Sequence, residues 1–330
     1  MDHFTEDLLR RRMHGLYLSR RCPELLQLSQ ELLGMHCWFH RNVAFSAVIR
    51  GADLTGWKNK LTKTWLYRGT LHGVDYEELP QLLALHAQDA FYYDWLMLTP
   101  AQAEKLIEKV IRVMEDGVYS RAEMREIFAY DYDQEVIGRI FSPWGGIFGL
   151  MARRGQVAFR SMVSRDFDLI SAEPTQSAEE VLPGLLRRYF KAYGPATLAD
   201  AALFFGFKTL PKVDLSGLEQ LEHDGKTYYY TEPDAPMGEI PRVTLLSGFD
   251  PLVVSYADRS AVLPKEYRKA VILSSGICLP TVAVDGQVAG IWNLKNKKPT
   301  LEFFTPQPKA VRNTAQELVE EICWKTLGQL

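Results

Sequence analysis

The sequence of 330 residues has few cysteines, no long apolar run and almost no excess of charge of either sign. Its four cysteines are far apart and form no CxxC pair, so the spacing indicates neither a zinc site nor a disulfide framework. We expect reduced, mostly buried thiols. No segment approaches the roughly 18 apolar residues that a membrane span needs. A formal net charge of −3 argues against nucleic-acid binding over the whole surface, although a DNA-binding protein can confine its positive charge to one face.

Motifs of nucleotide and metal chemistry are also missing. The sequence has no phosphate loop with Gly-Lys-Ser/Thr, no GxGxxG fingerprint opening a helix, no HExxH and no GxSxG elbow. We therefore expect neither a metal nor another cofactor. The stretch from Met1 to Asp7 is acidic and lacks the basic-then-apolar layout of a secretion signal, which predicts a cytoplasmic protein with no membrane partner.

What the sequence does contain is a repeated pattern. In each copy an amphipathic helix leads to a glycine, a hydroxyl residue, an acid three residues later and a phenylalanine, at the same spacing: Gly117, Ser120, Glu123 and Phe128, then Gly194, Thr197, Asp200 and Phe205. A hydroxyl residue followed three positions later by an acid is typical of a capped helix start. The pattern therefore predicts a duplicated helix-turn-helix.

Each copy is expected to continue into a short apolar helix and then a glycine-centred hairpin, with turns at 153–156 and 223–226. A helix-turn-helix followed by a β-hairpin is a winged helix, which usually binds DNA. A first, less regular module of the same kind is predicted from an extended segment at 62–74, which mixes aromatic, β-branched and polar residues. Helices are expected before it at 4–18, 23–33 and 43–50.

The last part of the chain changes to short strands, which we expect at 243–246, 252–255, 281–284 and 289–292. The pair Asp285-Gly286 between two of them is a strong hairpin signal. A small β-barrel or curled sheet fits this pattern, with a final helix from Lys309 to about Leu327. An aromatic cluster at 91–95 is expected to be mostly buried packing.

These elements predict an α+β protein of three tandem winged-helix modules with a C-terminal small β-barrel. The predicted boundaries are 1–98 for the first winged helix with its connecting helices, 99–172 and 173–240 for the next two, and 241–330 for the barrel and final helix. A length of 330 residues agrees with several packed modules, since domains commonly have about 100–200 residues.

Positive charge is concentrated in the predicted second module. Between residues 139 and 165 the chain has five arginines and no acid, and all five follow here: Arg139, Arg153, Arg154, Arg160 and Arg165. This stretch covers the predicted third helix and wing, the elements through which a winged helix approaches a duplex. The alternative is a solvated helix face followed by an ordinary turn.

Over nearly its whole length the chain resembles the tandem winged-helix DNA glycosylases of the AlkZ and YcaQ type. The matching segments are Thr64 to His72, Trp144-Gly145-Gly146 with Arg153-Arg154-Gly155, Tyr193 to Thr197, and Gly248-Phe249-Asp250 with Tyr256 to Ser260. Members of this family excise alkylated bases and unhook interstrand crosslinks. The resemblance implies three winged helices around DNA and a C-terminal β-barrel.

The resemblance also implies a catalytic segment. The family signature is a Gln-x-Gln or Gln-x-Asp tripeptide after a glycine and before a helix that ends in arginine. Here Gly34 precedes His36 and Trp38, which occupy the two polar positions, and Arg50 closes the helix. Neutral His36 could accept a proton from water, whereas Trp38 could only stack on a base. The alternative is that both side chains are structural.

Further DNA contacts are predicted on the first wing and near the end of the chain. Arg68, Thr70 and His72 would alternate along a strand and share one face, from which they could reach a phosphate or a lesion. Arg259 lies in a turn beside Asp258, where a DNA contact and a structural ion pair are both open.

The leading prediction is therefore a monomer that binds double-stranded DNA, alkylated or crosslinked, and that would act as a monofunctional DNA glycosylase if it is an enzyme. Such an enzyme hydrolyses the N-glycosidic bond of alkylated purines. The alternative is a non-catalytic DNA-binding protein, either a transcriptional regulator or a lesion binder, because His36-Cys37-Trp38 replaces the family tripeptide. A weaker third possibility is a protein-interaction scaffold.

Overall fold

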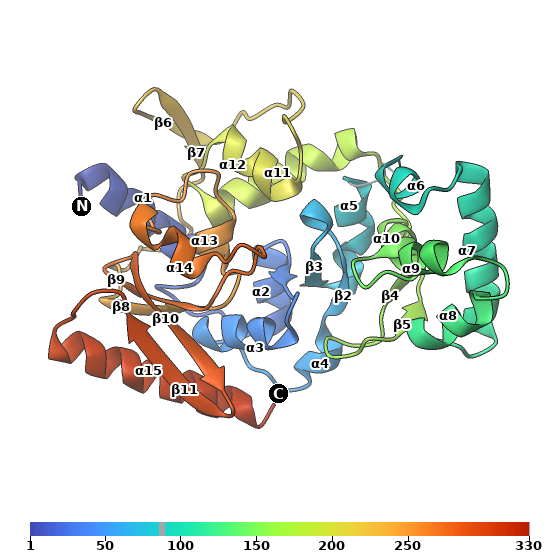
Figure 1. Ribbon diagram of the computed structural model, residues 1–330. Helices are drawn as coiled ribbons and strands as arrows, with labels where there is room; N and C mark the ends of the chain where they lie inside the picture. Colours follow the sequence, from blue (N-terminus) through green and yellow to red (C-terminus); the bar gives the residue numbers. More distant parts are fainter. Residues whose placement is uncertain (86–89, 330) are drawn as a thin grey trace. The chain divides into compact units, whose positions relative to one another are not determined.

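The computed structural model describes residues 1–85 and 90–329, and it has mixed α+β architecture with antiparallel sheets (Figure 1). Contacts within the chain divide it into two compact units. The terminal unit comprises Met1–Trp57 and Pro183–Leu330, and the central unit comprises Lys58–Leu182. Of the helices described, none is long and apolar enough to span a membrane.

The terminal unit contains helices from both ends of the chain, a short strand, a hairpin and a sheet. Its helical segments are α1 (His3–Gly15), α2 (Leu25–Glu31), α3 (His40–Ile49), most of α11 (Ala178–Tyr193), α12 (Leu198–Phe205), α13 (Pro251–Val254), η3 (Lys265–Tyr267), α14 (Arg268–Val271) and α15 (Lys309–Leu327). Its strands are β1 (Met35–His36), β6 (Glu219–His223), β7 (Lys226–Tyr230), β8 (Val243–Leu246), β9 (Thr281–Val284), β10 (Gln287–Lys295) and β11 (Lys298–Phe303).

The central unit is built from short helices on an antiparallel sheet in which β3, β2, β4 and β5 lie in that order. Its helical segments are α4 (Trp57–Lys60, which begins at the unit boundary), η1 (Tyr67–Gly69), η2 (Tyr76–Glu78), α5 (Leu79–Ala84), α6 (Ala90–Leu96), α7 (Pro100–Glu115), α8 (Arg121–Phe128), α9 (Gln134–Ile140) and α10 (Gly146–Arg153). Its strands are β2 (Thr62–Trp65), β3 (Leu71–Val74), β4 (Val157–Phe159) and β5 (Phe167–Leu169). The two hairpins meet where Lys63 pairs with Phe159.

The repeated helix starts are confirmed. Ser120 caps α8 by accepting a hydrogen bond from the backbone amide of Glu123. Thr197 caps α12 in the same way. The Asp200 carboxylate accepts a hydrogen bond from the backbone amide of Thr197, which completes a capping box. Such caps satisfy backbone amides that the first turn of a helix leaves without partners.

The predicted hairpin at 153–156 is wrong. Gly155, at a φ of 74°, ends α10 instead, where its amide and that of Gln156 donate to carbonyls of the last helical turn. A glycine in the left-handed region is the usual helix C-terminus. The hairpin of this copy is β4–β5, whose turn comes several residues later.

In the second copy the hairpin at 223–226 is confirmed as β6–β7. Asp224 and Gly225 both have positive φ, as a two-residue type I′ turn requires. The prediction of a short helix before this hairpin is wrong: residues 207–218, all of which the structure describes, contain no helix.

The C-terminal sheet differs from the predicted barrel. Its strand order is β11-β10-β9-β8, so over the described residues the sheet is open and not closed. The Asp285-Gly286 turn between β9 and β10 is confirmed, and α15 follows the predicted range and packs against β8 and β11. Inside, buried Trp292 contacts Phe45 edge to face at 5.0 Å between ring centroids.

Residues 252–255 were predicted as a strand, but residues 252–254 form most of α13 and Ser255 caps its end. Asp250 accepts a hydrogen bond from the amide of Leu252, and Pro251 occupies the first turn. A cap followed by a first-turn proline favours a helix even where the apolar, β-branched side chains suit a strand.

The aromatic cluster at 91–95 is only partly buried. Tyr92 is 5% exposed, whereas Tyr93 and Trp95 are half-buried, and the side chain of Phe91 lies outside the described residues. Packing therefore explains Tyr92 and leaves part of the Trp95 indole accessible. All four cysteines are buried.

Candidate functional site

Residues 36–38, which we predict to correspond to the family tripeptide, lie in the terminal unit, where β1 leads into α3. The half-buried His36 ring stacks on Phe249, with ring centroids 4.1 Å apart and planes 8° apart. Cys37 is buried, and Trp38 is half-buried. The phenyl ring covers one face of the imidazole and therefore fixes its orientation.

A buried ion pair determines where Phe249 lies. Asp250 is the residue that follows Phe249 in the chain. It accepts two hydrogen bonds, at 3.0 and 3.1 Å, from Arg50, which lies immediately after α3. Both side chains are 0% exposed. The Arg50 guanidinium also donates to the Leu16 carbonyl and to Ser46, so its charge is neutralised and its donors are well used.

Close packing of α3 against residues 247–250 supports the same arrangement. A Cβ on Gly248 would lie 2.8 Å from the Asn42 side chain, so only glycine permits this approach. Phe249 itself has a φ of 56°, a backbone conformation that costs free energy in a bulky residue. The fold thus holds the Phe249 ring against His36 at some conformational cost.

The chemistry open to this site is proton transfer by His36. An imidazole titrates near neutral pH and can take a proton from water. Neither Phe249 nor Trp38 can do so, and both can stack on an aromatic base. The contact between Phe249 and His36 could not be predicted from the sequence, because the two residues are far apart in the chain.

The arginines of the predicted basic patch lie in the central unit, and acids outside residues 139–165 pair with three of them. Arg139 pairs with Glu135 at 2.9 Å, one helical turn earlier. Arg154 makes two hydrogen bonds with Glu104 of α7 and a third with the Tyr93 hydroxyl. The Arg154–Glu104 pair joins the end of α10 to α7, and both pairs reduce the charge that could attract a phosphate.

Arg160 is exposed beside β4, pairs with Asp168 at 3.1 Å and lies over the Tyr119 ring. Arg153 lies over the Tyr92 ring, 5.3 Å from its centroid. The arginines therefore occupy different surroundings, and the absence of acids between 139 and 165 in the sequence overstates the positive charge of this surface.

The side chains predicted on the first wing do not alternate along one strand. Arg68 lies in η1, the turn between β2 and β3, at a φ of 55°, and Thr70 ends that turn with its hydroxyl on the Tyr67 carbonyl. His72 is buried in β3. Burial, assisted by the nearby charge of Arg68, lowers the pKa of His72 to about 3, so its ring is neutral near pH 7. The prediction of a shared face is wrong because the chain turns at Arg68.

Arg50 and Arg259 do not form a surface charge cluster. Arg50 belongs to the buried pair described above, and in that conformation it cannot reach a phosphate. Arg259 is half-buried, and burial lowers its pKa. Asp258 pairs with Lys226 of β7 at 3.1 Å, and hydrogen bonds from Ser260, with a smaller contribution from Lys226, lower the Asp258 pKa to about 2.

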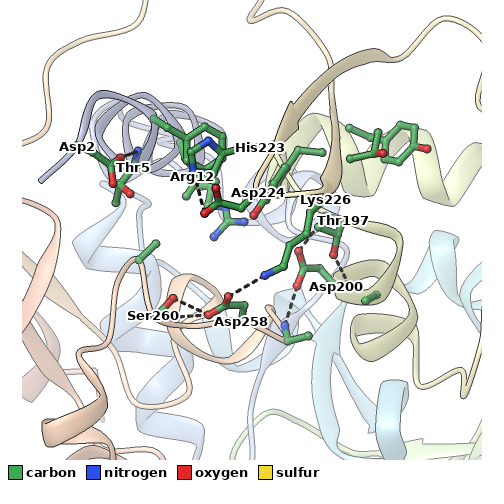
Figure 2. A pocket seen from close by; sticks show the side chains of 18 of the residues that line it. Asp2, Thr5, Arg12, Thr197, Asp200, His223, Asp224, Lys226, Asp258 and Ser260 are labelled. Carbon is green, nitrogen blue, oxygen red and sulfur yellow. Dashed lines mark hydrogen bonds and ion pairs between the residues drawn. The ribbon is translucent and has the colours of Figure 1, made fainter.

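The terminal unit also contains a cavity of about 710 Å³ between α1, the start of α12 and the β6–β7 hairpin (Figure 2). Lys226 reaches across it to Asp258, while Asp200 accepts backbone hydrogen bonds from Thr197 and Ala257. Two permanent cations line this cavity, Arg12 and Lys226. Four acids line it as well: Asp2, Asp200, Asp224 and Asp258. This excess of negative charge disfavours a DNA phosphate.

No three His, Cys, Asp or Glu side chains within the described residues gather to hold a metal ion. Burial raises the pKa of the Cys278 thiol to about 12, so this thiol is protonated near pH 7 and is a poor nucleophile.

Comparison with known proteins identifies the relatives of this chain. The model of a family described as "DNA glycosylase AlkZ-like" matches residues 57–323. A protein of Streptomyces sahachiroi named "Interstrand DNA cross-link repair glycosylase" is 27% identical over 293 residues, which cover 79% of this chain and 77% of the relative. The structure of Streptomyces sahachiroi DNA glycosylase AlkZ superimposes with a TM-score of 0.80 at 22% identity, covering 98% of this chain and 97% of that one, and shows a shared fold.

Proposed function

The chain belongs to the AlkZ-like DNA glycosylase family, and we propose that it is a DNA repair glycosylase that acts on alkylated or crosslinked duplex DNA. The observation that carries the proposal is the stacked His36–Phe249 pair, in the segment that the resemblance aligns with the family's catalytic tripeptide. The relative from Streptomyces sahachiroi, named for crosslink repair, supports the same class of substrate. We also propose that the chain forms three winged-helix modules and acts as a monomer.

In the proposed reaction a water molecule attacks C1′ of the damaged nucleotide and His36 accepts its proton. The C1′–N9 bond breaks, and its electron pair neutralises the positive charge that alkylation at N7 placed on the purine. The transition state resembles an oxocarbenium ion, as in other glycoside hydrolyses. Phe249 orients the imidazole, and Trp38 supplies an aromatic face on which a base can stack.

The test is base excision by the purified protein on a duplex with a single N7-methylguanine, under single-turnover conditions. Abasic sites are converted to strand breaks and counted. Removal of a general base typically lowers a rate by about 10²- to 10⁴-fold, so we expect that loss for His36→Ala. Binding to the same duplex should change much less.

The chain offers a matched control. His223 stacks on Phe4 with centroids 3.6 Å apart and planes 8° apart, which is the same kind of contact in the same unit. His223→Ala should therefore keep the excision rate of the original protein. Equal rates in His36→Ala and His223→Ala would remove His36 from the mechanism.

A second function, lesion binding without hydrolysis, is favoured by one observation. Trp38 stands at the second polar position of the tripeptide, and an indole cannot accept a proton from water. If this function is the true one, the protein binds the N7-methylguanine duplex more tightly than the undamaged duplex and produces no abasic sites.

A further inference from the structure

A second cavity, of about 340 Å³, lies wholly within the central unit. Its polar and aromatic lining comes from three segments: Arg68 from the β2–β3 turn, Tyr92 and Trp95 from α6, and Trp144 and Arg153 from the turn before α10 and the end of that helix. None of the described residues that line it is acidic. Two cations and three aromatic rings around one cavity form a site for an anionic, aromatic ligand.

The aromatic floor of this cavity is held by close packing. A Cβ on Gly149 would lie 2.8 Å from the Tyr92 ring, so the ring rests directly on the backbone of α10. The Arg153 guanidinium lies 5.3 Å from the centroid of the same ring. Tyr92 is therefore fixed, and it places Arg153 at the cavity.

Trp144 is the unusual member of the lining because it is 69% exposed. The backbone around it is rigid: Gly145 and Gly146 have φ values of 136° and 58°, and a Cβ on Gly146 would collide with the Ile140 carbonyl. The turn thus fixes where the indole stands. An indole exposed to this extent beside a cavity can stack with a ligand, the contact by which many proteins bind unpaired bases.

Arg68 reaches the cavity from a turn with similar constraints. Hydrogen bonds from the amides of Gly69 and Thr70 to Leu66 and Tyr67 close this turn, and Arg68 has a φ of 55°. A non-glycine residue in this conformation is uncommon and is often found at a functional site. Arginine is also the side chain best suited to a phosphate, because its planar fork can donate two hydrogen bonds.

We propose that this cavity binds one unpaired nucleotide of DNA, with its base stacked on Trp144 and Trp95 and its phosphate on Arg68 and Arg153. The identity of the polymer rests on the proposed function, whereas the preference for an unpaired base comes from the cavity alone. A base inside an intact duplex is stacked on both faces by its neighbours and offers no face to an indole, so the site should prefer a disrupted duplex to an intact one.

The test compares two fluorescein-labelled duplexes of equal length, one fully paired and one with a single-nucleotide bulge, by equilibrium anisotropy with the full chain. The original protein should bind the bulged duplex more tightly. Trp144→Ala should reduce this preference about fivefold or more, since stacking of one base on an aromatic residue commonly contributes that much. Trp324→Ala is the control, because Trp324 is 77% exposed on α15 in the other unit.

The phosphate contact is tested with Arg153→Gln on the same duplexes. Loss of one phosphate contact should weaken binding to the bulged duplex and reduce the salt dependence of its affinity by about one unit of the logarithmic slope. Far-UV circular dichroism verifies that each variant is folded. An unchanged preference for the bulge in Trp144→Ala overturns the proposal.

Excision of N7-methylguanine by the original protein is measured beside the binding assay, and the two results together separate this inference from the proposed function. A preference for the bulge that depends on Trp144, without any abasic sites, supports the cavity and refutes the glycosylase. Abasic sites without a preference for the bulge support the glycosylase and refute the cavity.

Discussion

The buried Arg50–Asp250 pair leads to a prediction about stability. Removing the Asp250 carboxylate in Asp250→Ala leaves the Arg50 guanidinium, which is 0% exposed, without its negative partner. Breaking a buried ion pair in this way costs about 3–5 kcal/mol. The same change removes the side-chain cap of α13, which adds about 1 kcal/mol. We therefore expect a loss of roughly 4–6 kcal/mol in the free energy of unfolding.

The assay is urea denaturation followed by far-UV circular dichroism, in which the midpoint falls in proportion to the lost free energy. The matched control is Asp258→Ala, because the Lys226–Asp258 pair is exposed, with 49% and 58% of the two side chains accessible. An exposed pair contributes about 0–1 kcal/mol. A midpoint for Asp250→Ala that equals that of Asp258→Ala would refute the reasoning.

A double substitution tests the cause. Arg50→Met combined with Asp250→Leu removes both charges and fills much of the same volume, and such replacements are often neutral or stabilising. The double variant should therefore be more stable than Asp250→Ala. If it is less stable, the pair contributes more through its hydrogen bonds than through the avoidance of an unpaired charge.

Three further predictions follow from single residues. Thr197→Ala should lower the free energy of unfolding by about 1 kcal/mol because it removes the cap of α12, measured by urea denaturation against Thr197→Ser, which keeps a hydroxyl. Burial lowers the pKa of His72 to about 3, so this imidazole should show no titration by NMR above about pH 4. The stability that the neutral His72 contributes should be complete above its unfolded pKa of about 6.5, and it should be lost as the pH falls towards 3. The Asp258 pKa of about 2 is likewise lower than in the unfolded chain, so the stability difference between the original protein and Asp258→Asn should be present above about pH 4 and vanish near pH 2; a constant difference would contradict this.

Sequence-local features predicted the helix starts and tight turns. Ser120 and Thr197 cap helices because the partner amide lies only three residues away, and Asp285-Gly286 forms its turn because two successive residues can adopt positive φ. Interactions of this range are contained in a few consecutive residues. They were therefore visible without the tertiary structure.

The errors arose where one sequence pattern fits two structures. Gly155 suits both a hairpin turn and a helix end, and the preceding α10 decides for the helix end. Residues 252–255 suit both a strand and a helix, and the Asp250 cap decides for the helix. In both cases the flanking residues determined the outcome, which propensity alone does not specify.

By itself, the sequence determined an α+β protein with duplicated, capped helices, and its resemblance to the AlkZ-like family was confirmed. The tertiary structure alone decided which charges are neutralised, as Glu104 does for Arg154, and which rings meet, as Phe249 does with His36. The physical reason is range: caps and turns depend on neighbours a few residues away, whereas ion pairs, stacked rings and cavities form between segments that only the folded chain brings together.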